Sequence, residues 1–69
     1  MKTVYLFSKE EEKQLLKEFC CINNRSYHMV CKIMYENLLG EESMKDSMRT
    51  FKYFISGKLH INYDYIKFE

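Results

Sequence analysis

Residues 3–20, TVYLFSKEEEKQLLKEFC, contain the change of pattern that decides the fold class. β-Branched and aromatic side chains predominate from Thr3 to Phe7, which is typical of a strand. Ser8 and Glu11 then have the spacing of a capping box, in which each side chain accepts a hydrogen bond from the other's backbone N–H. Apolar residues recur at helical spacing from there to the Asn23-Asn24 pair, which tolerates the left-handed geometry of a helix end. The segment therefore predicts a strand followed at once by a helix.

Two further helices are predicted downstream. The second extends from about Arg25 to Leu39, with Gly40 beyond its end. The third starts at Ser43, where Asp46 supplies a second capping box, and Gly57 ends it. We predict that the shared core of the three helices consists of Phe19, Met34, Leu38, Phe51 and Ile55.

The last stretch changes to a period of two. Apolar and polar side chains alternate from Lys58 to Phe68, as in a half-buried strand, but the alternation shifts phase near Asp64. A turn or bulge around Asn62 to Asp64 would explain the shift. We therefore predict an α+β fold with an N-terminal strand, a three-helix core and a C-terminal β-hairpin or bent strand.

Composition limits the functional classes. At 69 residues the chain is expected to form a single small domain, residues 1–69. Apolar residues make up 46% and aromatic residues 16%, which supplies the large side chains that a small core needs. The formal net charge of +1 excludes binding to nucleic acid or membrane through overall charge.

Cysteine use and hydropathy predict a cytoplasmic protein. The three cysteines form an odd set without a disulfide framework, and no apolar run approaches the roughly 20 residues of a membrane span. Residues with AT-rich codons dominate, whereas Ala and Pro are missing. This bias is typical of a low-GC bacterium, a phage or a large DNA virus, and a phage or virus protein would act in the host cytoplasm.

One group of cysteine and histidine residues is the best candidate for a metal site in the sequence. It consists of Cys20, Cys21, His28 and Cys31, and zinc accepts such ligands. However, Cys20 and Cys31 lie on apolar stripes, where a free cysteine acts as a small hydrophobe, and there is no pair of Cys-x-x-Cys motifs. A glycine-rich phosphate loop is also missing. We therefore expect no metal, no cofactor and no enzymatic activity.

Tyrosine is in excess for so small a core. The chain has six tyrosines, and tyrosine is enriched at protein interfaces because it combines a large contact area with a polar tip. Several of them lie off the main helical stripes or near the phase shift. We predict a protein-binding group of Tyr35, Tyr53, Tyr63 and Tyr65. The alternative is that several of these side chains cover the rim of the core.

The third predicted helix also has a basic edge. Lys45, Arg49 and Lys52 share one face, and Lys58 follows at the helix end. Three helices followed by a β segment resemble a winged helix–turn–helix, a resemblance that implies a third helix in the DNA major groove and a hairpin wing on the backbone. Two features depart from that family. The middle of the second helix, where a small residue is usual, has the large residues Met34, Tyr35 and Glu36. The start of the third helix, where phosphates would approach, has the carboxylates Glu41, Glu42 and Asp46, which repel DNA.

Two functional hypotheses remain open from the sequence. The leading one is a non-catalytic regulator or inhibitor, encoded by a phage or virus, that binds a larger protein. The alternative is a DNA-binding transcriptional regulator of the winged-helix type. A homodimer is compatible with both.

Overall fold

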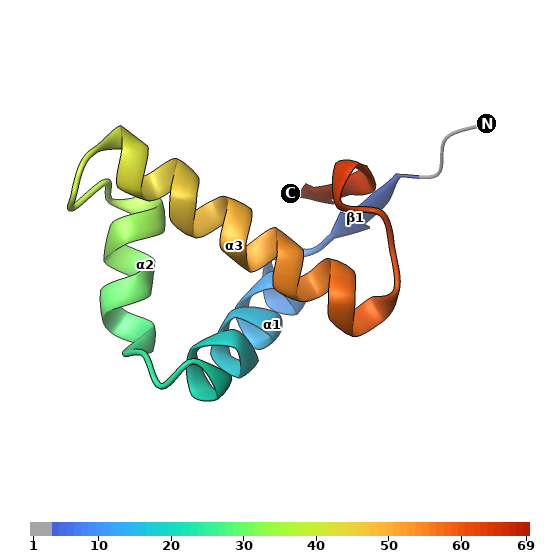
Figure 1. The fold of residues 1–69 in the computed structure, drawn as a ribbon, viewed down its shortest axis with the longest axis horizontal. Coiled ribbons are helices and arrows are strands. Elements are labelled where there is room, and N and C mark those ends of the chain that lie inside the picture. Colours follow the sequence, from blue (N-terminus) through green and yellow to red (C-terminus); the bar gives the residue numbers. More distant parts are fainter. Residues whose placement is uncertain (1–3) are drawn as a thin grey trace.

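The computed structural model, which describes residues 4–69, has a strand, three helices, a short 3₁₀ turn and a second strand. Their bounds are β1 Tyr5–Phe7, α1 Lys9–Ile22, α2 Tyr27–Tyr35, α3 Glu41–Leu59, η1 Tyr63–Tyr65 and β2 Ile66–Phe68. The helices surround one core, and the strands lie beside the second half of α3 (Figure 1). The predicted α+β class is confirmed. The first residue of the predicted strand, Thr3, lies outside the described residues.

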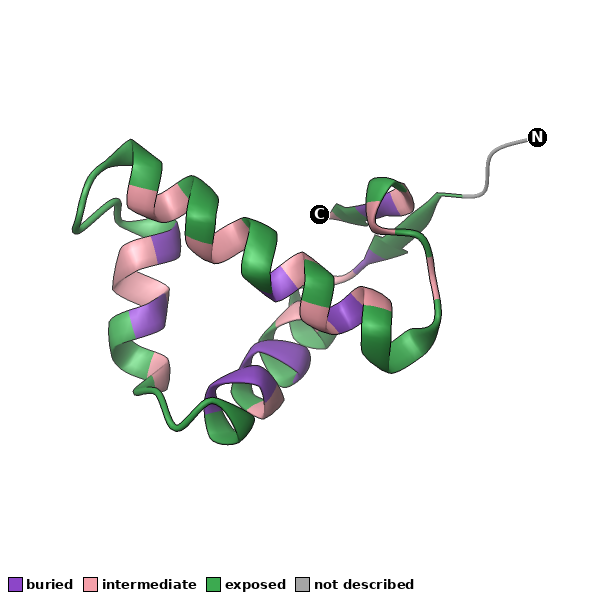
Figure 2. Cartoon of the chain, in the orientation of Figure 1, coloured by how far each residue is buried: buried purple, intermediate pink, exposed green. Residues whose placement is uncertain are grey.

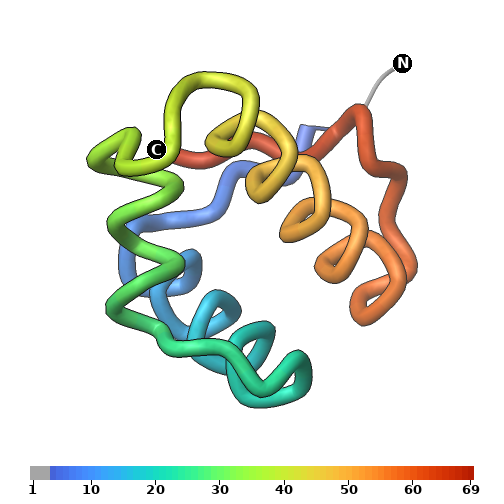
Figure 3. The backbone as a smooth tube through the Cα atoms, turned by 60° about the vertical axis from the view of Figure 1, so that its left-hand side comes forward, coloured from blue at the N-terminus to red at the C-terminus, as the bar shows by residue number. Residues whose placement is uncertain are grey.

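The two strands form a parallel pair, which the sequence did not predict. Tyr5 pairs with Ile66 and Phe7 with Phe68, and the backbone N–H of Glu69 donates to the Phe7 carbonyl at 3.0 Å. Parallel strands need a long connection, and here α1, α2 and α3 supply it (Figure 3). The C-terminal segment is thus a single short strand after a turn. Residues 4–69 contain no β-hairpin, because β2 pairs with β1 instead of a neighbour.

The start of α1 forms as predicted. The Ser8 N–H donates to Glu11 Oε1 at 3.0 Å, and the Glu11 N–H donates to Ser8 Oγ at 3.2 Å. This capping box satisfies two of the backbone donors that every helix start leaves free. At the other end Asn24 has a left-handed φ of 54°, so the predicted helix end is also confirmed.

The boundary between α2 and α3 differs from the prediction. Helix α2 ends at Tyr35 instead of Leu39, because Asn37 takes a left-handed φ of 58°. Gly40, at φ 94°, is the N-cap of α3, so this helix begins at Glu41 and the predicted capping box of Ser43 and Asp46 does not form. Glycine allows that backbone geometry without steric cost, and carboxylates in the first turn favour the earlier start.

The end of α3 also differs from the prediction. The helix continues through Gly57 to Leu59, and His60 ends it in a left-handed conformation with φ 55°. The predicted β segment from Lys58 was therefore wrong for Lys58 and Leu59, which are helical. The predicted turn near Asn62 is confirmed as η1, where Asn62 Oδ1 accepts the Asp64 N–H at 2.8 Å.

The core lies where the inner faces of the helices meet the sheet (Figure 2). Its buried residues are Phe7, Leu15, Leu16, Phe19, Cys20, Val30, Met34, Phe51, Ile55 and Ile66. Four of the five predicted core residues are among them. The fifth, Leu38, is 51% exposed, because α2 ends before it and the chain turns outward.

The Phe51→Ala variant tests this core. Phe51 is fully buried, and its ring packs against Phe19 at 5.6 Å between centroids. We expect the free energy of unfolding to fall by about 3–5 kcal/mol, because the variant loses buried area and leaves a cavity. Urea denaturation followed by circular dichroism measures the change. The matched control, Leu38→Ala, should alter stability by less than about 0.5 kcal/mol. A larger loss for Leu38→Ala than for Phe51→Ala would contradict this packing.

Candidate functional site

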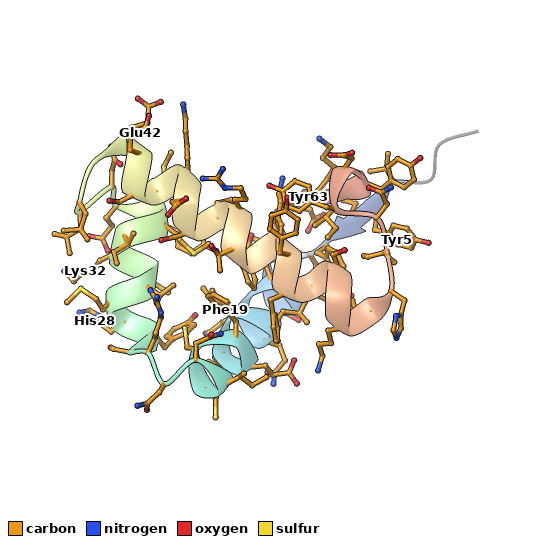
Figure 4. The ribbon with its side chains drawn as sticks, viewed as in Figure 1. Tyr5, Phe19, His28, Lys32, Glu42 and Tyr63 are labelled. Atoms are coloured by element: carbon orange, nitrogen blue, oxygen red, sulfur yellow. The ribbon has the colours of Figure 1, made fainter. Side chains whose placement is uncertain are left out.

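Two of the four predicted tyrosines pack their rings together in a tilted arrangement on the outer side of α3. Tyr53 projects from α3 and is 60% exposed, and its ring lies 4.4 Å from that of Tyr63 between centroids, with an interplanar angle of 30°. The ammonium of Lys52 lies 5.6 Å from the centroid of the Tyr63 ring. We call Lys52, Tyr53 and Tyr63 the tyrosine platform. Figure 4 shows Tyr63 lying over α3 from the C-terminal turn.

The turn after α3 holds the platform in place. Ser56 Oγ donates to the Ile61 carbonyl at 2.6 Å, which fixes the chain reversal at the helix end. The Asn62 side chain then caps η1, in which Tyr63 is the first residue. The backbone turn is hydrogen-bonded and the two rings contact each other, so less side-chain freedom remains to be lost on binding, which favours affinity.

The other two predicted tyrosines have different surroundings. Tyr65 lies in η1 and is half-buried. Tyr35 lies at the end of α2, where its hydroxyl donates a hydrogen bond of 2.8 Å to Glu12 Oε1 of α1. Partial burial raises the pKa of the Tyr35 hydroxyl, and the hydrogen bond to Glu12 raises it further. The structure therefore assigns Tyr35 to a link between α1 and α2, away from the platform.

The predicted basic edge is present on the solvent face of α3, but its charges are engaged within the chain. Lys45 pairs with Glu41 at 3.3 Å, and Arg49 pairs with Asp46. These exposed pairs stabilise the fold little, but they place a carboxylate beside each cation. The face therefore has far less positive potential than the sequence spacing of its cations indicates.

The remaining two cations of the basic group also interact with other side chains. Lys58 pairs with Glu18 of α1 at 3.3 Å, and Lys52 lies over the Tyr63 ring. The exposed lysines of α1 make no ion pair within residues 4–69, although the Lys17 ammonium lies 5.7 Å from the centroid of the Tyr27 ring. These residues, which the sequence prediction missed, are Lys9, Lys13 and Lys17. Their spacing of four residues was the available signal.

The cysteine and histidine set is divided by the fold. Cys20 is buried in the core with Cys31 packed against it, whereas Cys21 and His28 are exposed. Among residues 4–69, no three His, Cys, Asp or Glu side chains are close enough to hold a metal ion. Burial raises the pKa of the Cys20 thiol, and the nearby Cys31 adds to the shift. A thiol with a raised pKa is a poor nucleophile at neutral pH.

A small hollow lies between the three helices. It has a volume of about 100 Å³ and is lined by Phe19, Asn23, Arg25, Val30, Asp46, Ser47 and Thr50. Small-molecule sites usually enclose about 300–1,000 Å³, so this hollow is too small to surround a typical ligand.

Comparisons with known proteins do not assign the chain to a family. No protein-family model matches the chain, and no curated protein or solved structure is significantly similar to it. Within residues 4–69, no helix is both long enough and apolar enough to cross a bilayer.

The raised pKa of Tyr35 predicts a loss of stability in alkali. The pKa of a tyrosine in the unfolded chain is about 10, whereas folded Tyr35 keeps its proton to higher pH. Its contribution is therefore complete below about pH 10 and declines as pH rises above that value. Urea unfolding at a series of pH values should show a shallower alkaline decline for Tyr35→Phe than for the wild type. Superimposable curves would refute the role of the hydrogen bond to Glu12.

Metal removal is expected to leave the fold unchanged. Cys20 belongs to the apolar core, so we expect packing, without an ion, to hold α1 and α2 together. Helical circular dichroism and the melting temperature should be the same with and without excess chelator. A domain that depended on zinc would lose its helical signal, since its metal-binding energy is folding energy.

Proposed function

We propose that the chain is a non-catalytic regulatory or inhibitory protein that acts by binding a larger protein. The observation that carries the proposal is the tyrosine platform, in which the exposed Tyr53 of α3 packs against the half-buried Tyr63 of η1. Exposed aromatic rings of this kind supply most of the binding energy at protein interfaces.

The charge distribution of α3 supports a protein partner over DNA. The cations that would contact phosphates lie beside carboxylates, and both Glu41 and Glu42 are at the helix start, where phosphates would approach. The parallel pairing of β2 also leaves no hairpin in residues 4–69 that would serve as a wing. A mixed charge surface around aromatic rings is instead typical of the rim and centre of a protein interface.

The alternative, a DNA-binding regulator, has one favourable observation. Lys45, Arg49 and Lys52 lie on one side of α3, and the ion pairs of Lys45 and Arg49 are exposed enough to open. An experiment must therefore distinguish aromatic from electrostatic binding.

Affinity capture from a lysate of the source cells, with and without nuclease, tests the proposal. We expect the bound protein to survive nuclease and to be absent when the Tyr53→Ala variant is the bait, because an interface aromatic often contributes about 2 kcal/mol or more. Tyr5→Ala, at an exposed tyrosine on β1, is the matched control and should retain binding. Circular dichroism and melting temperature confirm that each variant is folded.

Neutralising the cations of α3 is the second part of this test. The triple variant Lys45→Gln, Arg49→Gln, Lys52→Gln keeps both tyrosine rings of the platform. It should slow association only moderately, since charges at the rim steer encounters more than they hold the complex. The matched control neutralises Lys9, Lys13 and Lys17 on α1. If the chain instead binds DNA, the α3 variant should bind duplex DNA much more weakly, whereas the α1 variant should bind it as the wild type does. The salt dependence of the α3 variant should also flatten by about 0.9 units of slope for each DNA phosphate that the variant no longer neutralises.

A further inference from the structure

The turn between α2 and α3 displays two neighbouring leucines. Leu38 and Leu39 are its central residues, and they are 51% and 63% exposed. The backbone around them is hydrogen-bonded: the Gly40 N–H donates to the Asn37 carbonyl at 3.2 Å, and the Leu38 N–H donates to the Lys32 carbonyl at 3.1 Å. The two side chains therefore extend from an ordered turn.

The conformation of this turn does not require leucine at these positions. The centre of a β-turn usually holds Gly, Pro, Asn, Asp or Ser, whose conformational or hydrogen-bonding properties favour the turn. Here the left-handed or glycine-like conformations fall on the flanking residues, Asn37 and Gly40, which leaves the tip free for other side chains. Apolar groups that are ordered, adjacent and exposed are typical of docking surfaces.

The charges next to the leucines specify the partner. Residues 36–42 contain three carboxylates, Glu36, Glu41 and Glu42, and no cation. Figure 4 shows Glu42 pointing away from the body of the molecule at the start of α3. Lys45, one turn further along α3, is paired with Glu41, and Lys32 extends outward from α2. A polyanion such as nucleic acid or an anionic lipid surface would be repelled here, whereas a basic protein surface would be attracted.

We propose that Leu38 and Leu39 insert into an apolar pocket, rimmed by Lys or Arg, on a protein partner. The inference rests on the proposed function and adds a second binding surface to it. The tyrosine platform lies in the other half of α3, with Tyr53 about 18 Å along the helix axis from Glu41. The two surfaces can therefore be tested separately in the same experiment.

Photo-crosslinking from two positions is the test. Leu39→p-benzoylphenylalanine reports on the leucine turn and Tyr53→p-benzoylphenylalanine on the platform, each irradiated in a lysate of the source cells. We expect position 39 to crosslink to a protein other than a second copy of this chain, at a peptide that contains apolar residues flanked by Lys or Arg. Leu38→Ser should reduce the yield from position 39 by about tenfold, because it removes half of the inserted apolar surface. It should leave the yield from position 53 within about twofold, because the platform is separate.

Charge variants complete the test. Glu36→Gln, Glu41→Gln and Glu42→Gln together should lower the yield from position 39 by about tenfold through slower association. The matched control changes Glu10, Glu18 and Glu69 to Gln, which alters the net charge equally at other places. A crosslink from position 39 to a second copy of the chain, to lipid or to a peptide without Lys or Arg overturns the inference. So does the absence of a crosslink there. If position 53 still crosslinks to a protein, only the leucine turn is refuted; if it does not, the proposed function fails as well.

Discussion

The packing of the Phe51 ring holds the two strands against the helices. Phe51 is fully buried near the middle of α3, and it stacks on Phe68 of β2 with 5.6 Å between centroids and an interplanar angle of 5°. It also meets Phe19 of α1, and Phe68 in turn reaches Phe7 of β1 at 6.1 Å. The chain's five phenylalanines thus form one connected network that joins both strands to two of the helices.

The parallel sheet depends on this aromatic network. Each strand has only three residues, and a two-stranded sheet of this length is not stable in water by itself. Ile66 is fully buried at the start of β2, and it pairs with the backbone of β1. Hydrophobic burial against α3 and α1 therefore supplies the free energy that backbone pairing alone would lack.

The same helix, α3, supports both proposed binding surfaces. Its inner face is fixed by Phe51 and Ile55, so its outer face and its first turn have a defined position. The tyrosine platform requires the reversal after Leu59, and the leucine turn requires the N-cap conformation of Gly40. Both surfaces thus depend on the turns that begin and end α3, at Gly40 and His60, because these turns determine which neighbouring side chains face solvent.

Local chemistry was enough to predict the elements that depend on neighbouring residues. The Ser8 capping box, the left-handed turn at Asn24 and the Asn62 turn all use side chains within a few residues of the backbone groups that they bind. The apolar spacing of Phe19, Met34, Phe51 and Ile55 likewise placed them in the core, because helical periodicity determines which residues share a face.

Only the tertiary structure decided the pairing of the strands and the boundaries around the turns. Period-two alternation from Lys58 is compatible with a strand, but packing of Ile55 and hydrogen bonding of Ser56 to Ile61 keep the residues up to Leu59 helical. Leu38 fits a helical stripe in the sequence, yet α2 ends before it reaches the core. The ring contact of Tyr53 with Tyr63, and the pairing of Ile66 with Tyr5, join residues that only the folded chain brings together. Such interactions have no local sequence pattern, because their free energy comes from burial against distant parts of the chain.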